Sequence, residues 1–116
     1  MLIRVDPSAE APLFEQLSTA VRAAVISGEA KAGERLPSAR ELAESLAINV
    51  HTVLRAYQEL RDEGLIELRR GRGAVIVASP RSYDALNAAI AVAVAEAKKL
   101  DLPPAALAAL IREAYQ

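Results

Sequence analysis

Four arginines lie in the stretch 68–81, which contains no acidic residue. Three of them, Arg69, Arg70 and Arg72, are interleaved with Gly71 and Gly73. Guanidinium groups donate paired hydrogen bonds to phosphate oxygens, and glycine lets the backbone come close to a polyanion. A solvated charged turn is the simpler explanation of the cluster taken alone. The choice between the two depends on what precedes these arginines in the chain.

A second group of candidates lies on a predicted helix that is capped by Asn49 and ends at Gly64. The apolar residues that recur at helical spacing on its inner face are Val53, Ala56, Tyr57 and Leu60. The remaining residues near its N-terminal end are Val50, His51, Thr52, Leu54 and Arg55. A helix that enters the major groove of DNA reads base edges with its first residues. This face, with the Asn49 cap, therefore predicts a DNA-binding surface.

Val50 and Leu54 are unusual because they are apolar side chains on a face predicted to meet water. Van der Waals contact with thymine methyl groups gives such side chains a function. The alternative is that scattered surface aliphatic residues are ordinary. We favour the DNA contact, since both lie on the one face that must meet the groove. Thr52, in the first turn, is placed to contact a phosphate.

Catalytic chemistry has no support in the sequence. His51 is the only histidine and the chain has no cysteine, which excludes multi-histidine and thiolate metal sites. No serine or threonine has a histidine and carboxylate partner set. The glycines at 71 and 73 are not a P-loop, because no Lys-Ser/Thr pair follows them. We therefore expect no enzyme activity, no metal and no cofactor.

Three helices are predicted before the arginines. The first spans residues 12–27, with Gly28 as its left-handed cap. The second is short and opens at Ser38, which forms a capping box with Glu41. Only two residues separate its end from the Asn49 cap of the third helix. Two helices joined by so short a turn must cross steeply, which is the helix-turn-helix arrangement.

The pattern changes from helical to strand-like after residue 64. Residues 65–68 and 74–77 are apolar and β-prone, and they flank the segment 69–73. Two strands around a short glycine-bearing loop form a hairpin, with the arginines at its tip. Residues 34–36 are compatible with one further short strand. The predicted fold class is mainly α with a small β-hairpin, a winged helix-turn-helix.

Two more helices are expected after the Ser-Pro break at residues 79 and 80, over 82–100 and 104–115. Apolar residues of the first recur at alternating spacings of four and three, as in a coiled coil. We predict that this seam and one face of the last helix hold a homodimer together. The residues assigned to the interface are Leu86, Ile90, Ala93, Ala97, Leu100, Leu107, Leu110 and Ile111. The domains are then a DNA-binding domain, residues 1–78, and a helical dimerisation segment, residues 79–116.

The overall composition fits a folded chain with an aliphatic core, since 53% of the residues are hydrophobic and 3% aromatic. No segment suits a signal peptide or a membrane span, so we expect a soluble, cytoplasmic protein with no membrane partner.

The net charge of −1 counts against the simplest expectation for a DNA-binding domain. It leaves open a winged helix that docks a protein partner through Val50 and Leu54, although that alternative does not explain the arginine-rich tip. An unidentified small-molecule effector is compatible with DNA binding, but no convergent polar set marks its site.

Five blocks, in order, resemble those of the GntR family of bacterial regulators. They are PLFEQL at 12–17, LPSARELA at 36–43, TVLRAYQEL at 52–60, EGLI at 63–66 and RRGRG at 69–73. The two helices that remain after the fifth block are similar to those of the YtrA subfamily. In that subfamily, the C-terminal helices are a dimerisation device.

The resemblance implies a repressor that binds double-stranded DNA at an inverted-repeat operator as a homodimer. It assigns DNA contacts to the block that contains Ser38 and Arg40, to the first turn of the third helix, and to the hairpin tip. Many relatives have arginine where Val50 stands, and some have a basic residue at Leu54. Readout is therefore expected to shift toward thymine methyls and DNA shape. The operator, the regulated genes, the effector and the sign of regulation stay open.

Overall fold

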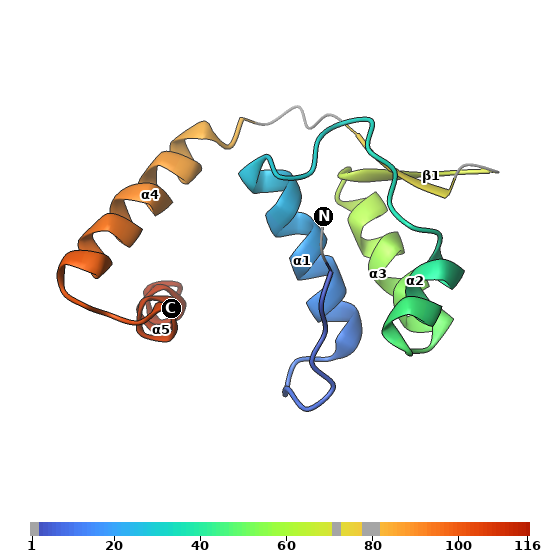
Figure 1. Ribbon diagram of the computed structural model, residues 1–116. Helices are drawn as coiled ribbons and strands as arrows, with labels where there is room; N and C mark the ends of the chain where they lie inside the picture. The colour runs from blue at the N-terminus through green and yellow to red at the C-terminus, as the bar shows by residue number, and fades with distance from the viewer. Residues whose placement is uncertain (1–2, 71–72, 78–81) are drawn as a thin grey trace. The chain divides into compact units, whose positions relative to one another are not determined.

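The computed structural model describes residues 3–70, 73–77 and 82–116 (Figure 1). The chain divides into two compact units, Met1–Arg81 and Ser82–Gln116, which we call unit 1 and unit 2 and describe separately. Unit 1 contains helices α1, α2 and α3 and the hairpin of strands β1 and β2, whereas unit 2 contains helices α4 and α5. The element order agrees with the predicted fold class.

Helix α1 spans Leu13–Ser27 and ends at Gly28, whose φ of 85° is the left-handed conformation of a glycine cap. Pro12 takes the cap position before the helix rather than the first helical position expected of it. The segment before α1 is fixed to the helix by Gln16. This side chain accepts the Asp6 N–H (2.7 Å) and donates to the Asp6 carbonyl (3.0 Å), a clamp that the sequence did not predict.

Helices α2 (Ala39–Leu46) and α3 (Val50–Asp62) form the helix-turn-helix. The predicted capping box is present. The Glu41 N–H donates to Ser38 Oγ (3.1 Å), and the Ser38 N–H donates to Glu41 Oε1 (3.3 Å). In the turn, Ala47 adopts a left-handed φ of 56°. This residue redirects the chain, so that α2 crosses α3 (Figure 1).

Strands β1 (Ile66–Arg69) and β2 (Gly73–Ile76) pair antiparallel, with Arg69 opposite Gly73. Both strands therefore lie one residue closer to the tip than predicted. Arg69 and Gly73 belong to the strands and not to the loop, because their backbones complete the ladder of pairs. The further short strand expected at residues 34–36 is present as a single bridge between Arg35 and Val75.

Unit 1 has one apolar core, formed by the inner faces of its three helices and of the hairpin. The predicted inner residues of α3 are all at most 2% exposed: Val53, Ala56, Tyr57 and Leu60. At the surface, Arg22 of α1 forms an ion pair with Glu63 at the end of α3 (2.8 Å). The core and this pair fix α3 against α1, and thereby set which face of α3 is turned outward.

Unit 2 consists of α4 (Asp84–Lys99) and α5 (Pro104–Ala114). Helix α5 runs across the direction of α4 (Figure 1). Ala97 is the one buried residue of α4, and α5 has none. Two short helices that cross have little surface to bury against each other, so unit 2 has no apolar core of its own.

Candidate nucleic-acid interface

The start of α2, the outer face of α3 and the hairpin meet on one side of unit 1. A shallow hollow there is lined by Ser38, Leu54, Leu68 and Arg70, together with neighbouring residues of the same elements. The hairpin comes close to α2, since a Cβ on Gly73 would lie 4.0 Å from the Ser38 Cα. We call this side of unit 1 the hollow face. It brings together three groups of residues that the sequence assigned to DNA contact.

Tyr57 fixes the chain just before α2 to helix α3. Its ring is buried in the core, and its hydroxyl donates a 2.7 Å hydrogen bond to the Pro37 carbonyl. Burial raises the pKa of the Tyr57 hydroxyl far above its ordinary value, and the negative charge of Glu41 adds to the shift. The hydroxyl therefore stays protonated and keeps its role as a donor. The sequence marked Tyr57 only as a core residue.

The first turn of α3 presents polar side chains beside the hollow face. Asn49 caps the helix as predicted, with its Oδ1 accepting the His51 N–H (2.8 Å). Asn49 and His51 are exposed, and Thr52 is half-buried. The N-terminal end of a helix with exposed polar side chains is suited to contact base edges and phosphates.

Val50 differs from the expectation that it stands out into solvent. It is half-buried and packs against the core of unit 1. It also lines a second shallow hollow, in which the exposed Arg40 and Glu44 of α2 take part. Helical periodicity alone does not reveal this packing of Val50 against the core. Leu54, 37% exposed, is the aliphatic side chain that α3 leaves open to solvent.

Arg55 lies toward α1. Its guanidinium carbon stands 3.7 Å from the centroid of the Phe14 ring, in the geometry of a cation–π contact. The sequence missed this contact because the two residues are far apart in the chain. Arg55 thus helps to hold α3 against α1, and a DNA contact for it stays a prediction.

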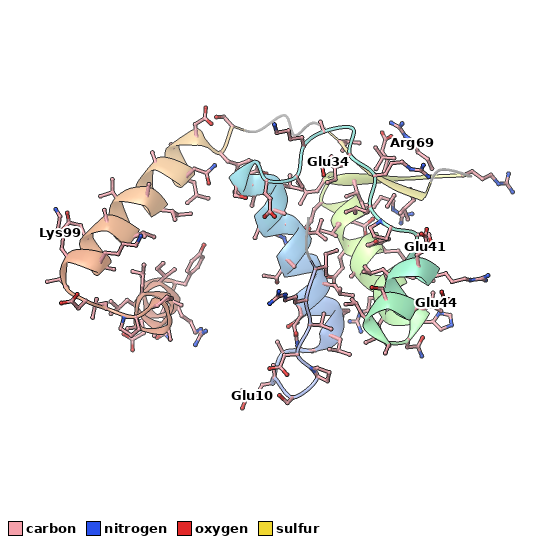
Figure 2. The ribbon with its side chains drawn as sticks, in the orientation of Figure 1. Glu10, Glu34, Glu41, Glu44, Arg69 and Lys99 are labelled. Carbon is pink, nitrogen blue, oxygen red and sulfur yellow. The ribbon has the colours of Figure 1, made fainter. Side chains whose placement is uncertain are left out.

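The arginines of the hairpin differ in their surroundings. Side chains alternate between the two faces of a strand, so Glu67 and Arg69 share one face of β1 and Leu68 lies on the other, although Arg69 also lines an edge of the hollow. Glu67 Oε2 accepts hydrogen bonds from Arg69 Nε (2.9 Å) and Nη2 (2.8 Å). Figure 2 shows Arg69 at the hairpin.

Arg70 is also exposed and lines the hollow with Arg69, but it forms no ion pair with a carboxylate of the described residues. The positive charge of Arg69 is therefore partly compensated within the chain, which leaves Arg70 as the better-placed cation of the described hairpin. Gly71 and Arg72, which the sequence assigned to the tip, lie outside the described residues, and their contacts stay predictions.

The predicted dimer seam is mostly exposed. The large apolar side chains left at the surface are Leu86 (50%), Ile90 (47%), Leu100 (71%), Leu110 (55%) and Ile111 (47%). Ala93 and Leu107 are half-buried. Ala97 does not fit the assignment, because it is only 7% exposed in the single chain, where the turn after α4 folds back so that the Leu102 N–H donates to its carbonyl.

Two other kinds of site are missing from the part of the chain that the structure describes. No three histidine, aspartate or glutamate side chains come together as metal ligands. No described helix is long and apolar enough to cross a membrane.

A sequence model described as "Bacterial regulatory proteins, gntR family" matches residues 13–76. This match runs from the start of α1 to the end of β2. The chain belongs to the GntR family. The resemblance predicted from five sequence blocks is confirmed, and so is the winged helix-turn-helix, which is the DNA-binding domain of these transcription regulators.

Individual GntR-family proteins extend the match. The HTH-type transcriptional repressor YtrA of Bacillus subtilis (strain 168) is 43% identical over 75 residues, which cover 65% of this chain but only 58% of YtrA. The HTH-type transcriptional regulator Rv1152 of Mycobacterium tuberculosis is 40% identical over 94 residues, or 81% of this chain and 74% of Rv1152.

A solved structure, "YtrA from Sulfolobus acidocaldarius, a GntR-family transcription factor", superposes with a TM-score of 0.62 at 34% identity. It covers 82% of this chain and 99% of that one. The predicted resemblance to YtrA proteins is confirmed. Because these relatives are transcription regulators, the prediction that the chain is not an enzyme is confirmed as well.

Proposed function

We propose that this GntR-family protein is a cytoplasmic repressor that binds an inverted-repeat operator as a homodimer. Residues 1–78 bind duplex DNA and residues 79–116 join the two protomers. The observation that carries the proposal is the hollow face, where Ser38 of the α2 cap, the outer side of α3 and Arg70 of the hairpin line one surface. A surface built from these three parts matches the way winged helix-turn-helix domains meet a duplex.

Each part of this surface has its own role in the proposal. Helix α3 enters the major groove, and Asn49, His51 and Thr52 meet base edges and the adjoining phosphates. Arg40, exposed on α2 beside Val50, holds the DNA backbone on one side of α3. Arg70 and the hairpin tip hold it on the other. Two cationic anchors on either side of a helix fix its depth and register in the groove.

The dimer follows from the exposed seam of unit 2. Apolar side chains such as Ile90 and Leu110 are about half exposed in the single chain, and a second copy of the same segment covers them in the proposal. A two-fold axis through that interface presents two copies of α3 to the DNA. The operator is then an inverted repeat with its half-sites about one helical turn, or ~34 Å, apart or at a multiple of that spacing. The name of the Bacillus relative, a repressor, supports the sign of regulation.

The test begins with selection of bound sequences from a random DNA pool, using the full chain. We expect an inverted repeat to be enriched. Fluorescence anisotropy on the selected duplex then measures Arg40→Ala and Arg70→Ala. Each should weaken binding and reduce the salt slope of log K by about 1 for every phosphate left without its arginine.

Arg61→Ala is the matched control, because Arg61 is an exposed arginine at the opposite end of α3, near Asp62. It should bind close to wild type. An enriched motif without two-fold symmetry would contradict the dimeric operator. Equal binding by the Arg40, Arg70 and Arg61 variants would contradict the proposed surface.

A further inference from the structure

Leu54 of α3 and Leu68 of β1 stand apart from the other large apolar side chains of unit 1. Among its described residues, these two are left exposed, at 37% and 39%. They come from different elements, yet they line the same hollow. Tyr57 and Ala74, which also line it, are buried in the core. The two leucines are thus the outer edge of the core, where it opens onto the hollow face.

The position of Leu68 is not that of an ordinary surface residue. It lies on the face of β1 that also carries Ile66, which is buried at 2% exposure in the core. Leu68 therefore points toward α2 and α3, but the described part of unit 1 leaves 39% of it exposed. The rim of the hollow is polar and cationic, with Ser38 on one edge and Arg70 on another.

The occupant of this hollow must combine a small apolar group with nearby negative charge. Duplex DNA offers this combination in its major groove, where the C5 methyl of thymine projects close to the phosphate backbone. The other bases of unmodified DNA present polar edges there. The cationic rim matches the phosphates. Leu54, which lines the hollow, lies one helical turn beyond the start of α3, so the hollow is continuous with the DNA surface proposed above.

We propose that Leu54 and Leu68 together receive a thymine methyl group, so that a residue of the hairpin takes part in base selection. The inference rests on the proposed DNA-binding function and deepens it. It assigns Leu68, which the sequence did not single out, a specificity-determining role. It also gives Leu54 a role that Val50 does not share, because the half-buried side chain of Val50 packs against the core.

The test replaces thymidine by deoxyuridine, which removes the methyl and leaves every Watson–Crick hydrogen bond in place. The probe is the duplex selected from the random pool with the full wild-type chain, substituted at one half-site position at a time. We expect one position in each half-site at which the loss of the methyl weakens binding about fourfold, as expected for one buried carbon. The remaining thymidines should tolerate the change.

Protein variants then locate the effect. Leu54→Ala and Leu68→Ala should each bind the thymidine duplex more weakly than wild type and show no further loss with deoxyuridine at the sensitive position. Leu102→Ala is the matched control, because Leu102 has the same 37% exposure but belongs to unit 2. It should keep the fourfold sensitivity of wild type. Thermal melting followed by circular dichroism identifies any variant that is not folded. If one leucine variant is not folded, the deoxyuridine sensitivity of the other leucine variant tests the inference.

Two results would overturn the inference while leaving the proposed function intact. The first is a selected duplex whose binding is weakened by Arg40→Ala but not by deoxyuridine at any position. A selected duplex with no thymidine in its half-sites would count equally. The other is a leucine variant that keeps the fourfold sensitivity, which would exclude that leucine. Failure of the wild-type chain to enrich or bind any duplex would overturn the proposed function itself.

Discussion

Units 1 and 2 carry the same kind of helical apolar pattern, but only unit 1 buries it. The inner residues Leu17, Val21 and Leu60 of unit 1 are at most 1% exposed, whereas Ile90 and Leu110 of unit 2 are 47% and 55% exposed. Three helices and a hairpin enclose a core, and two crossed helices do not. An apolar stripe therefore predicts which face of a helix will be buried. The other elements of the chain determine whether that face is buried within the same chain.

This difference assigns separate tasks to the two units. A segment of two short helices is well below the size at which a single chain stabilises itself by apolar burial. Oligomerisation is the usual remedy, and it fits the proposed dimer. Unit 1 has a core of its own and can hold a DNA-binding surface in place. Substitutions in either unit test this contrast, and the largest effect is expected in the core of unit 1.

Leu60→Ala should destabilise unit 1 severely, because this side chain is fully buried in the core. We expect the free energy of unfolding to fall by about 2–5 kcal/mol, as for other buried leucines. Urea unfolding followed by circular dichroism measures it. The same substitution at the exposed Leu110 of unit 2 should change the value by less than about 0.5 kcal/mol at protein concentrations too low for dimers. Equal decreases in unfolding free energy for Leu60→Ala and Leu110→Ala would contradict the proposed difference between units 1 and 2.

Ile90→Asp should break the proposed dimer, because it places a charge in the exposed seam of α4. We expect sedimentation velocity to show a monomer. Operator affinity should drop by about 100-fold or more, since each half-site is then bound without its partner. Ala95→Asp puts the same charge on an exposed residue on the opposite side of α4 and should remain dimeric. A dimeric Ile90→Asp protein would show that the interface lies elsewhere.

Tyr57→Phe should have an intermediate effect, because it removes the hydrogen bond to the Pro37 carbonyl and leaves the ring in the core. We expect the unfolding free energy, measured in urea, to fall by about 1 kcal/mol.

The wild-type protein should also lose stability as the pH rises above 10, since the folded pKa of Tyr57 lies above its ordinary value and only the protonated hydroxyl fits the core. Phenylalanine does not titrate, so the variant should show a flatter decline. An identical alkaline decline in both proteins would contradict the role given to this hydroxyl.

Glu67→Gln should produce the smallest effect, and in the opposite direction. It removes the carboxylate that holds Arg69 at 2.8 Å and so frees a cation of the hairpin. We expect operator binding to tighten by about twofold to fivefold, in line with the strength of an exposed ion pair.

Glu96→Gln is the control, because Glu96 forms a similar exposed pair with Lys99 in unit 2. It should not alter DNA affinity. Weaker binding by Glu67→Gln would mean instead that Glu67 orients Arg69 toward the DNA.

The features that the sequence predicted well are local ones. The Ser38–Glu41 capping box, the Asn49 cap and the Gly28 stop each depend on residues within one helical turn, and each is present. The inner face of α3 was also correct, because a single helical period determines which side chains lie together.

The features that the sequence missed depend on contacts across the fold. Val50 packs against the core of unit 1, and Arg55 lies over the ring of Phe14 on another helix. The role proposed for Leu68 depends on its position opposite α3, which strand periodicity does not predict. The pairing of Glu67 with Arg69 could have been foreseen, since residues two apart in a strand share a face. The DNA contacts assigned to individual residues stay predictions.

The salt dependence of operator binding by the full chain tests the proposed DNA-binding surface as a whole. In the proposed complex, two protomers with Arg40 and Arg70 make at least four contacts to phosphates. Anisotropy titrations over a series of KCl concentrations should therefore give a slope of log K against log salt of about −3.6 or steeper. Arg40→Ala should make that slope shallower by about 1.8, one contact in each protomer. A slope near zero, or one that Arg40→Ala leaves unchanged, would contradict the proposed surface.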